Sequence, residues 1–339
     1  MSIEILYATE AGTRMMINIT ESPWKGRIDT EDGQLGLRWH QVVQDYPLLP
    51  DNGVSLLGLA SDLGVKFNKG RTGAAEGPVA LRRALSNMAW HLDTPLYDAG
   101  DIHVEDDLAA GQEEYAHRAQ QLLSDNQFVV GLGGGHELGW AGYRGLRLWL
   151  EEEHPEKRLG ILNLDAHFDV RKPAPNNSSG TPFRQAAEDS ARLGREFNYA
   201  CIGVSQPFNT RSLFQFADQQ GAVYLEDLDC QHSIPDQFLL NWLEGIDVLY
   251  LTTCLDVLPA STAPGVSAPA ALGVPLSVLL DMIRRLETLC RQSDVEWKMA
   301  DIAELNPSLD LDQRTAKSAA RMVHEILRSK FGSESLSKA

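Results

Sequence analysis

The sequence predicts an α/β protein, a three-layer α/β/α sandwich around a mostly parallel sheet. Seven short apolar runs have the length of strands but lack strict alternation, as expected of strands covered on both faces. Amphipathic segments of helix length lie between these runs. Alternating strands and helices favour a parallel sheet with helices on both sides.

The strands are expected, in chain order, at residues 54–60, 127–133, 159–165, 199–204, 221–225, 248–257 and 295–305. A last helix is indicated by small and apolar side chains at intervals of three and four, which form one helical stripe: Ala316, Ala319, Ala320, Val323 and Leu327. A long loop with three prolines is expected at residues 171–182, directly after a strand. Loops of that length inside a compact domain usually serve function.

The 339 residues are long enough for one large α/β unit with a full core. We expect a single domain over residues 51–330, with residues 1–50 as a lead-in segment packed on it and residues 331–339 as a tail. No apolar run approaches the roughly 18 to 20 residues needed to cross a bilayer, and no signal peptide is recognisable. These features predict a cytoplasmic protein.

The composition restricts the classes of partner. The chain carries 47 acidic and 30 basic side chains, a formal net charge of −17, which disfavours binding to nucleic acid or to anionic membranes. Four widely spaced cysteines form no CxxC pair, so neither a disulfide scaffold nor a structural zinc site is indicated. The expected partners are small molecules, metal cations or protein.

Polar clusters follow three of the expected strands, where ligands bind in open parallel sheets. His136 follows a run of glycines, and its spacing fits neither a phosphate-binding GxGxxG motif nor a P-loop. Asp165, His167 and Asp169 alternate after the third strand, so in an extended backbone they would share one side. Asp256 ends another apolar run. Such groups are costly on a buried strand unless a cation compensates them.

Together these residues supply imidazole and carboxylate ligands, a mixture that suits Mn²⁺ or a related divalent ion. Five or six ligands exceed what one catalytic ion with an open position takes, which favours a pair of ions roughly 3.5 to 4 Å apart that ionise a shared water molecule. Metal-assisted hydrolysis follows as the reaction class. No GxSxG motif supports a serine hydrolase.

Several motifs in order along most of the chain resemble the ureohydrolase family, which includes arginase and agmatinase. They are GRTGAAEGPVALR (70–82), GGGHE (133–137), DAHFD (165–169), LDV (255–257), APG (263–265) and DIAELNP (301–307). Other segments resemble the bacterial formimidoylglutamase branch: WKGRID (24–29), LRWHQ (37–41), SSGTPFRQ (178–185) and VSAPAALGVP (266–275). Arginases typically carry a histidine where this chain reads Thr181, Pro182 and Phe183, which counts against arginase activity.

The resemblance implies an arginase-like sandwich, two Mn²⁺ ions per chain and ligand roles. His136 and Asp169 would hold one ion, His167 and Asp256 the other, and Asp165 would bridge them. One position departs from the family pattern, because Cys254 stands where most relatives have a bridging aspartate. A thiolate there would favour softer metals, and a neutral thiol would leave one ion weakly held.

For this branch the resemblance implies hydrolysis of N-formimidoyl-L-glutamate to L-glutamate and formamide, a step of histidine degradation. Glu304 matches the family glutamate that binds an amidine, and Asp169 is a candidate proton shuttle. The two substrate carboxylates require positive charge or polar donors, for which we expect Arg184 first, then Arg71, with Asn176 and Ser179.

Two other functions remain open at this point. One is a different ureohydrolase activity, on agmatine or a guanidino acid. The other is a catalytically silent metal-binding homologue that lost activity with its bridging aspartate. The family resemblance also implies a homo-oligomer.

Overall fold

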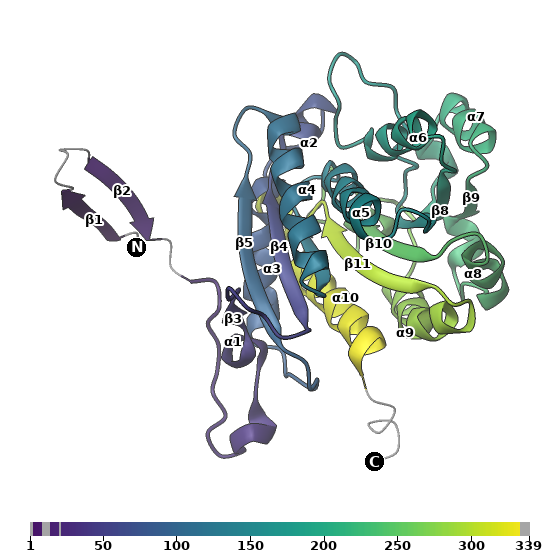
Figure 1. Cartoon of the computed structure of the whole chain (residues 1–339). Helices are drawn as coiled ribbons and strands as arrows, with labels where there is room; N and C mark the ends of the chain where they lie inside the picture. The colour runs from purple at the N-terminus through teal and green to yellow at the C-terminus, as the bar shows by residue number, and fades with distance from the viewer. Residues whose placement is uncertain (1–2, 9–13, 20–21, 333–339) are drawn as a thin grey trace.

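A computed structural model describes residues 3–8, 14–19 and 22–332 of the chain. Its centre is a nine-stranded sheet in the order β3-β5-β4-β6-β11-β10-β7-β8-β9, in which all paired strands are parallel (Figure 1). The strands are β3 (Gln44–Asp45), β4 (Val54–Ala60), β5 (Leu96–His103), β6 (Phe128–Gly133), β7 (Leu159–Leu164), β8 (Asn198–Val204), β9 (Val223–Glu226), β10 (Val248–Cys254) and β11 (Glu296–Ala303). Each of the seven strands expected from the apolar runs is present.

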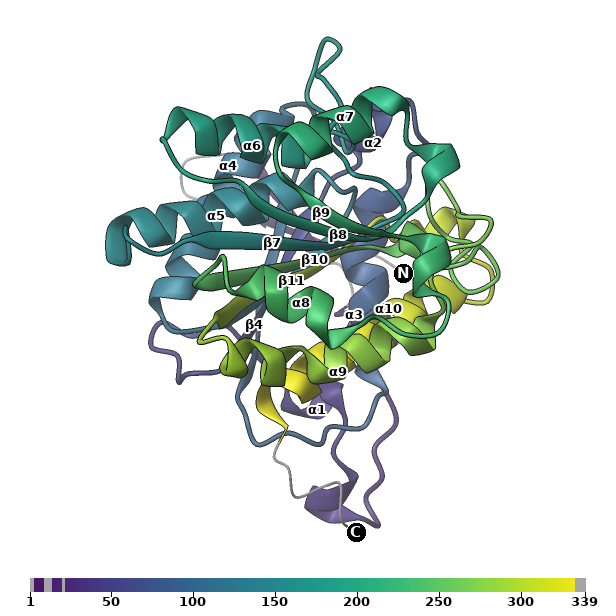
Figure 2. The same cartoon turned by 90° about the vertical axis from the view of Figure 1, so that its right-hand side faces the viewer.

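Helices cover both faces of this sheet, which confirms the three-layer prediction (Figure 2). One layer contains α4 (Leu108–Ser124), α5 (Leu138–Glu153), α6 (Pro182–Arg192) and α7 (Arg211–Gln219). The opposite layer contains α3 (Gly77–Ser86), α8 (Asp236–Leu243), α9 (Leu276–Gln292) and α10 (Arg314–Phe331). The short helix α2 (Leu63–Phe67) follows β4.

Successive strand residues fill the two cores in turn. Leu56 of β4 packs with the α3, α9 and α10 layer, and its neighbour Leu57 packs with the α4 and α5 layer. Both are fully buried, because the sheet is covered on both faces. The expected stripe of α10 is confirmed, since all five of its residues lie in the buried core.

The segment before residue 51 has two parts among the described residues. β1 (Ile3–Ala8) and β2 (Arg14–Ile19) pair antiparallel as a separate two-stranded sheet. Residues 22–50 contact the main body: α1 (Trp39–Val42) buries Trp39 fully, and β3 pairs with the edge strand β5. We propose that residues 51–330 form one domain on which the segment 22–50 packs. The tail beyond residue 332 lies outside the described residues.

β5 is a strand that the apolar pattern did not predict. Its sequence contains Asp98 and Asp101, and it is held by the buried guanidinium of Arg82 on α3. Arg82 Nη2 lies 2.8 Å from Asp98 Oδ1, and Arg82 Nη1 lies 2.6 Å from Asp101 Oδ1. The arginine therefore neutralises carboxylates that would otherwise disfavour a strand beside the core.

No helix in the described part of the chain is both long and apolar enough to span a bilayer.

Replacing Arg82 by methionine should lower the free energy of unfolding by about 3 to 5 kcal/mol, because two carboxylates lose their buried partner. Urea unfolding followed by circular dichroism measures this change. The neighbouring Arg83, which is exposed on the same helix, provides the matched control Arg83→Met. Equal stability of the two variants would contradict the role of the ion pair.

Candidate active site

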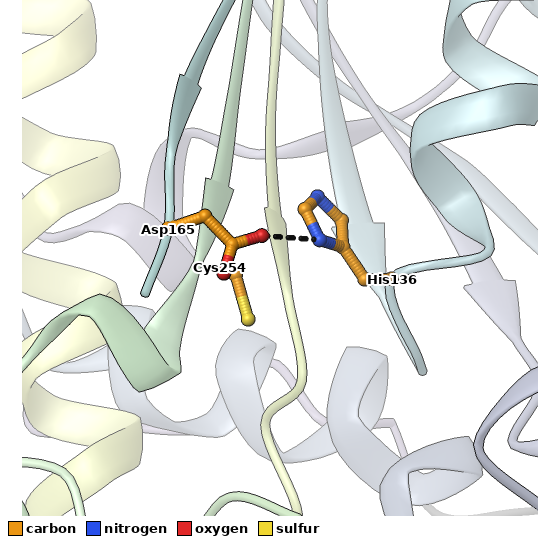
Figure 3. A group of neighbouring side chains, drawn as sticks. All are labelled: His136, Asp165 and Cys254. Atoms are coloured by element: carbon orange, nitrogen blue, oxygen red, sulfur yellow. Dashed lines mark ion pairs between the residues drawn. The ribbon is translucent and has the colours of Figure 1, made fainter. Parts of the chain in front are cut away.

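The predicted metal ligands and Glu304 meet at the carboxyl ends of four adjacent strands in the centre of the sheet. β6, β11, β10 and β7 are neighbours in that order, and all run parallel. His136 lies just after β6, Glu304 directly follows β11, Cys254 ends β10, and Asp165 directly follows β7. Figure 3 shows His136, Asp165 and Cys254 facing one another from three of these strands. Segments far apart in sequence therefore converge.

A cavity of about 370 Å³, here called the site cavity, opens over this cluster. Most of the expected metal ligands line it, as do several polar and basic side chains. Its lining consists of Asn68, Lys69, Gly70, Arg71, His136, His167, Asp169, Arg171, Ser179, Cys254, Asp256, Ser267, Ala268 and Glu304. Asp165 is fully buried at its side, 3.0 Å from His136 Nδ1.

The potential ligand atoms form two groups that share Asp165. His136, Asp165 and Cys254 form one, and Asp165, His167 and Asp256 form the other, with ligand atoms within 4.8 Å of one another in each. His167 Nδ1 lies 3.4 Å from Asp165 Oδ1 and 3.1 Å from Asp256 Oδ2. The arrangement offers two adjacent cation positions with one common carboxylate.

Asp169 contacts the first group through His136, by a route that the sequence pattern did not predict. β7 ends at Leu164, so the expectation of an extended backbone through residue 169 was wrong. Asp169 instead adopts a left-handed conformation with a φ of 49°, and its Oδ2 lies 2.8 Å from His136 Nδ1. Asn and Asp tolerate this conformation better than most residues do.

A chain of hydrogen bonds orients the ring of His136. The Thr252 hydroxyl donates to Asp301 Oδ1 over 2.8 Å, so its oxygen is free to accept from His136 Nε2 at 3.0 Å. With Nε2 as the donor, Nδ1 faces Asp165 and Asp169. Its lone pair can bind a cation there, and without a cation a proton on Nδ1 donates to these carboxylates. Partners of this kind set the tautomer of metal-binding histidines. Neither Thr252 nor Asp301 was among the site residues predicted from the sequence.

Glu304 is buried at the end of β11 and also contacts the glycine-rich turn after β6. Its Oε1 accepts from the backbone N–H of His136 at 2.8 Å, and its own N–H donates to Gly134 at 2.8 Å. Gly134 must be glycine, because a Cβ there would lie 1.9 Å from the backbone oxygen of Ser61. The close packing of this turn therefore places His136 and Glu304 together.

Burial and mutual charge shift the pKa values in this cluster. Burial and the charge of Glu137 raise the pKa of Glu304 to about 8. Burial and the charge of Asp165 raise the pKa of Asp169 to about 6. Burial would lower the pKa of His136, but hydrogen bonds to the two aspartates raise it well above its usual value. All three pKa values are raised, which indicates a surplus of buried negative charge around these groups.

Burial likewise raises the pKa of the Cys254 thiol, and the nearby carboxylates of Asp165 and Asp256 add to this effect. The thiol therefore stays protonated at neutral pH unless a cation binds it.

The residues present fit a pair of divalent cations. Asp256 Oδ1 is buried and has no hydrogen-bond partner among the described residues, as expected of an oxygen that awaits a metal. The donor set combines imidazole nitrogen with carboxylate oxygen, the mixture typical of Mn²⁺ and related ions. Cys254 is the single soft donor in it.

The residues expected to bind substrate carboxylates are divided between two cavities. Arg71 and Ser179 line the site cavity, and Arg184 and Asn176 line a neighbouring one instead. Arg71 is partly engaged, since its Nε and Nη2 donate to the backbone oxygens of Ser267 and Val266.

Arg171, from the long loop that was expected to offer donors to the substrate carboxylates, also lines the site cavity. So do Asn68, Lys69 and Ser267, which were not predicted. Arg171 directly follows the DAHFDV segment, and Lys69 directly precedes the glycine-rich loop, which are the sequence signals that point to them.

The chain is similar in sequence to proteins named formimidoylglutamase. Formimidoylglutamase from Hahella chejuensis is 45% identical over 306 residues, covering 89% of this chain and 93% of that protein. Formimidoylglutamase from Ralstonia nicotianae is 47% identical over 312 residues, covering 90% and 94%.

Two solved structures share the fold. Formimidoylglutamase from Bacillus subtilis superposes with a TM-score of 0.75 at 20% identity and covers 85% of this chain and 90% of its own. Formiminoglutamase from Trypanosoma cruzi, solved with Mn²⁺, has a TM-score of 0.72 at 25% identity and covers 83% and 94%. Residues 52–328 match the model of the arginase family, and the chain therefore belongs to that family.

Proposed function

We propose that the chain hydrolyses N-formimidoyl-L-glutamate to L-glutamate and formamide. The observation that carries this proposal is the 45 to 47% identity, over about nine tenths of the chain, to proteins named formimidoylglutamase. The convergence of His136, Asp165, His167, Asp169 and Asp256 in one cavity supports it.

We propose two Mn²⁺ ions as the cofactor, since the T. cruzi formiminoglutamase was solved with Mn²⁺. His136, Asp165 and Asp169 would hold one ion, with Cys254 beside it, and Asp165, His167 and Asp256 would hold the other. When bound, such a pair lowers the pKa of a shared water molecule and supplies hydroxide near neutral pH.

Glu304 would bind and orient the reacting group of the substrate. The formimidoyl group is an amidine, and its protonated form would lower the raised pKa of Glu304, so that the carboxylate accepts from the amidinium N–H groups. Because Oε1 of Glu304 already accepts from the His136 backbone, the carboxylate is held in place. A fixed carboxylate positions the amidine carbon for attack. Asp169 would pass a proton to the departing glutamate nitrogen, because it lines the site cavity beside His136.

Three basic residues and one serine would bind the two substrate carboxylates. Lys69, Arg71, Arg171 and Ser179 line the site cavity around its acidic floor. Local positive charge is needed to bind an anionic substrate, because a protein with a net charge of −17 repels anions in general. A substrate with an amidinium at one end and carboxylates at the other matches this separation of charge. Agmatine has no carboxylate, so the basic rim favours a substrate that is an acid.

Two further points belong to the proposal and rest on the family resemblance: the reaction is a step of histidine degradation, and the working form is a homo-oligomer. We also propose a cytoplasmic location, as expected from the sequence.

The activity itself is tested by incubating the purified chain with formimidoylglutamate, with and without added Mn²⁺. Release of L-glutamate and formamide is expected, and chelation should abolish it, since the hydroxide depends on the metal. Agmatine, arginine and guanidinobutyrate, assayed side by side, should react far more slowly. Faster turnover of any of these three would reassign the substrate, and inactivity on all four would favour a silent homologue.

Replacing Glu304 by glutamine should reduce kcat/KM for formimidoylglutamate roughly 10- to 100-fold, because a charge-assisted hydrogen bond contributes about 1.5 to 3 kcal/mol. Metal content and thermal stability should stay unchanged, since Glu304 belongs to neither ligand group. Steady-state kinetics and metal analysis of one preparation measure both effects. An unaltered kcat/KM would remove Glu304 from substrate binding.

We further propose that the neutral thiol of Cys254 weakens one of the two metal positions. Cys254→Asp should therefore raise the Mn²⁺ content of protein purified with added Mn²⁺, since an oxygen ligand suits this ion better than a thiol does. Cys254→Ser is the size-matched control without the added charge. If the aspartate variant binds no more Mn²⁺ than the wild type, the thiol is not the weak point.

A further inference from the structure

A second cavity, of about 430 Å³, lies beside the site cavity and is here called the loop cavity. It forms between the loop after β7, the start of α6 and the start of α7. Its lining residues are Phe67, Asn68, Lys69, Val170, Arg171, Lys172, Ala174, Asn176, Ser178, Arg184, Thr210, Ser212 and Leu213. Asn68, Lys69 and Arg171 also line the site cavity, so the two cavities adjoin across these three residues.

The loop cavity concentrates positive charge in an acidic chain. Lys69, Arg171, Lys172 and Arg184 line it, and no aspartate or glutamate does. Within the described residues, no carboxylate forms an ion pair with Lys69, Arg171 or Lys172. Three grouped positive charges without a carboxylate partner, in a protein of net charge −17, favour binding of an anion.

Arg184 is held in the geometry that an anion-binding arginine needs. Its Cζ lies 4.0 Å from the ring centroid of Phe216, and its Nε donates to Glu188 Oε1 at 3.0 Å. Its two terminal nitrogens have no hydrogen-bond partner among the described residues. A guanidinium fixed on one side loses little entropy when its free donors bind a carboxylate.

Neutral donors complete the lining. Ser178 Oγ accepts from the Gly180 N–H, so its own proton remains available, and the side chain is 6% exposed. The hydroxyls of Thr210 and Ser212 hydrogen-bond to each other at 2.9 Å, which leaves one proton of the pair for a ligand. The cavity thus combines charged and neutral donors, as sites for small organic anions do.

We propose that the loop cavity is a second carboxylate-binding site and the entrance compartment of the active site. A small dicarboxylic amino acid would dock there by its carboxylates before it passes Lys69 and Arg171 into the site cavity, and glutamate would leave by the same way. The carboxylate chemistry follows from the lining, whereas the link to turnover rests on the proposed function. Arg184 and Lys172 would act in capture only, since neither lines the site cavity.

The test uses the double variant Lys172→Gln/Arg184→Gln and measures binding without turnover. Isothermal titration calorimetry with L-glutamate should show affinity roughly tenfold or more below that of the wild type, because charge-assisted contacts are lost. Arg192→Gln is the matched control, since this residue also lies on α6 and lines neither cavity. Equal affinity of wild type and double variant, or no glutamate binding by the wild type, would overturn the proposal.

Kinetics separate capture from a role in the reacting complex. With formimidoylglutamate, the double variant should keep the wild-type kcat while kcat/KM falls about tenfold, and added KCl should lower kcat/KM more strongly in the wild type. A parallel fall in kcat would contradict an entrance role. The calorimetric measurement needs no turnover. It therefore tests whether the loop cavity binds carboxylates even if formimidoylglutamate is not hydrolysed.

Discussion

A surplus of negative charge is buried where four central strands of the sheet end. This charge determines which ligands the site can bind. Asp165, Asp169, Asp256 and Glu304 are each less than a tenth exposed and share one small volume with two histidines. Carboxylates so close together and shielded from water are strongly unfavourable without compensating cations. The two imidazoles offset part of this charge only when protonated, so divalent ions are the compensation that the chemistry of these groups favours.

The topology of the sheet makes this concentration possible. Four neighbouring parallel strands end at the same edge, so each delivers one or two polar groups without exposing its own backbone. Helical layers on both faces exclude water from the cluster, and Thr252 and Asp301 orient His136 from within the sheet. Outside this floor the charge changes sign, because Lys69 and Arg171 stand at the border of both cavities. An acidic floor beneath a basic rim selects ligands that carry both kinds of charge.

Much of this arrangement could be predicted from local sequence patterns, for physical reasons. Continuous apolar runs such as residues 54–60 are typical of strands covered on both faces, and the stripe of α10 has a helical period. The polar residues at strand ends pointed to a common edge because parallel strands finish together. The motifs with family resemblance added the expected ligand roles.

The remaining features depend on contacts that a linear pattern does not contain. β5 is stabilised by Arg82, whose partners lie 16 and 19 residues away. The left-handed turn at Asp169 replaces the expected extension with a different route to the same ligand position. Arg184 was expected in the substrate site, yet α6 carries it into the adjoining cavity. Each case is a tertiary contact that overrides a local preference.

One buried carboxylate, that of Asp165, belongs to both groups of potential metal ligands. Calorimetric titration of Mn²⁺ into metal-free wild type and into Asp165→Asn measures how far both positions depend on it. We expect two ions per wild-type chain, with the ion beside Cys254 held more weakly, and a loss of affinity at both positions in the variant. If Asp165→Asn binds as many ions as the wild type, or binds them with the same affinity, then Asp165 is not shared by the two positions.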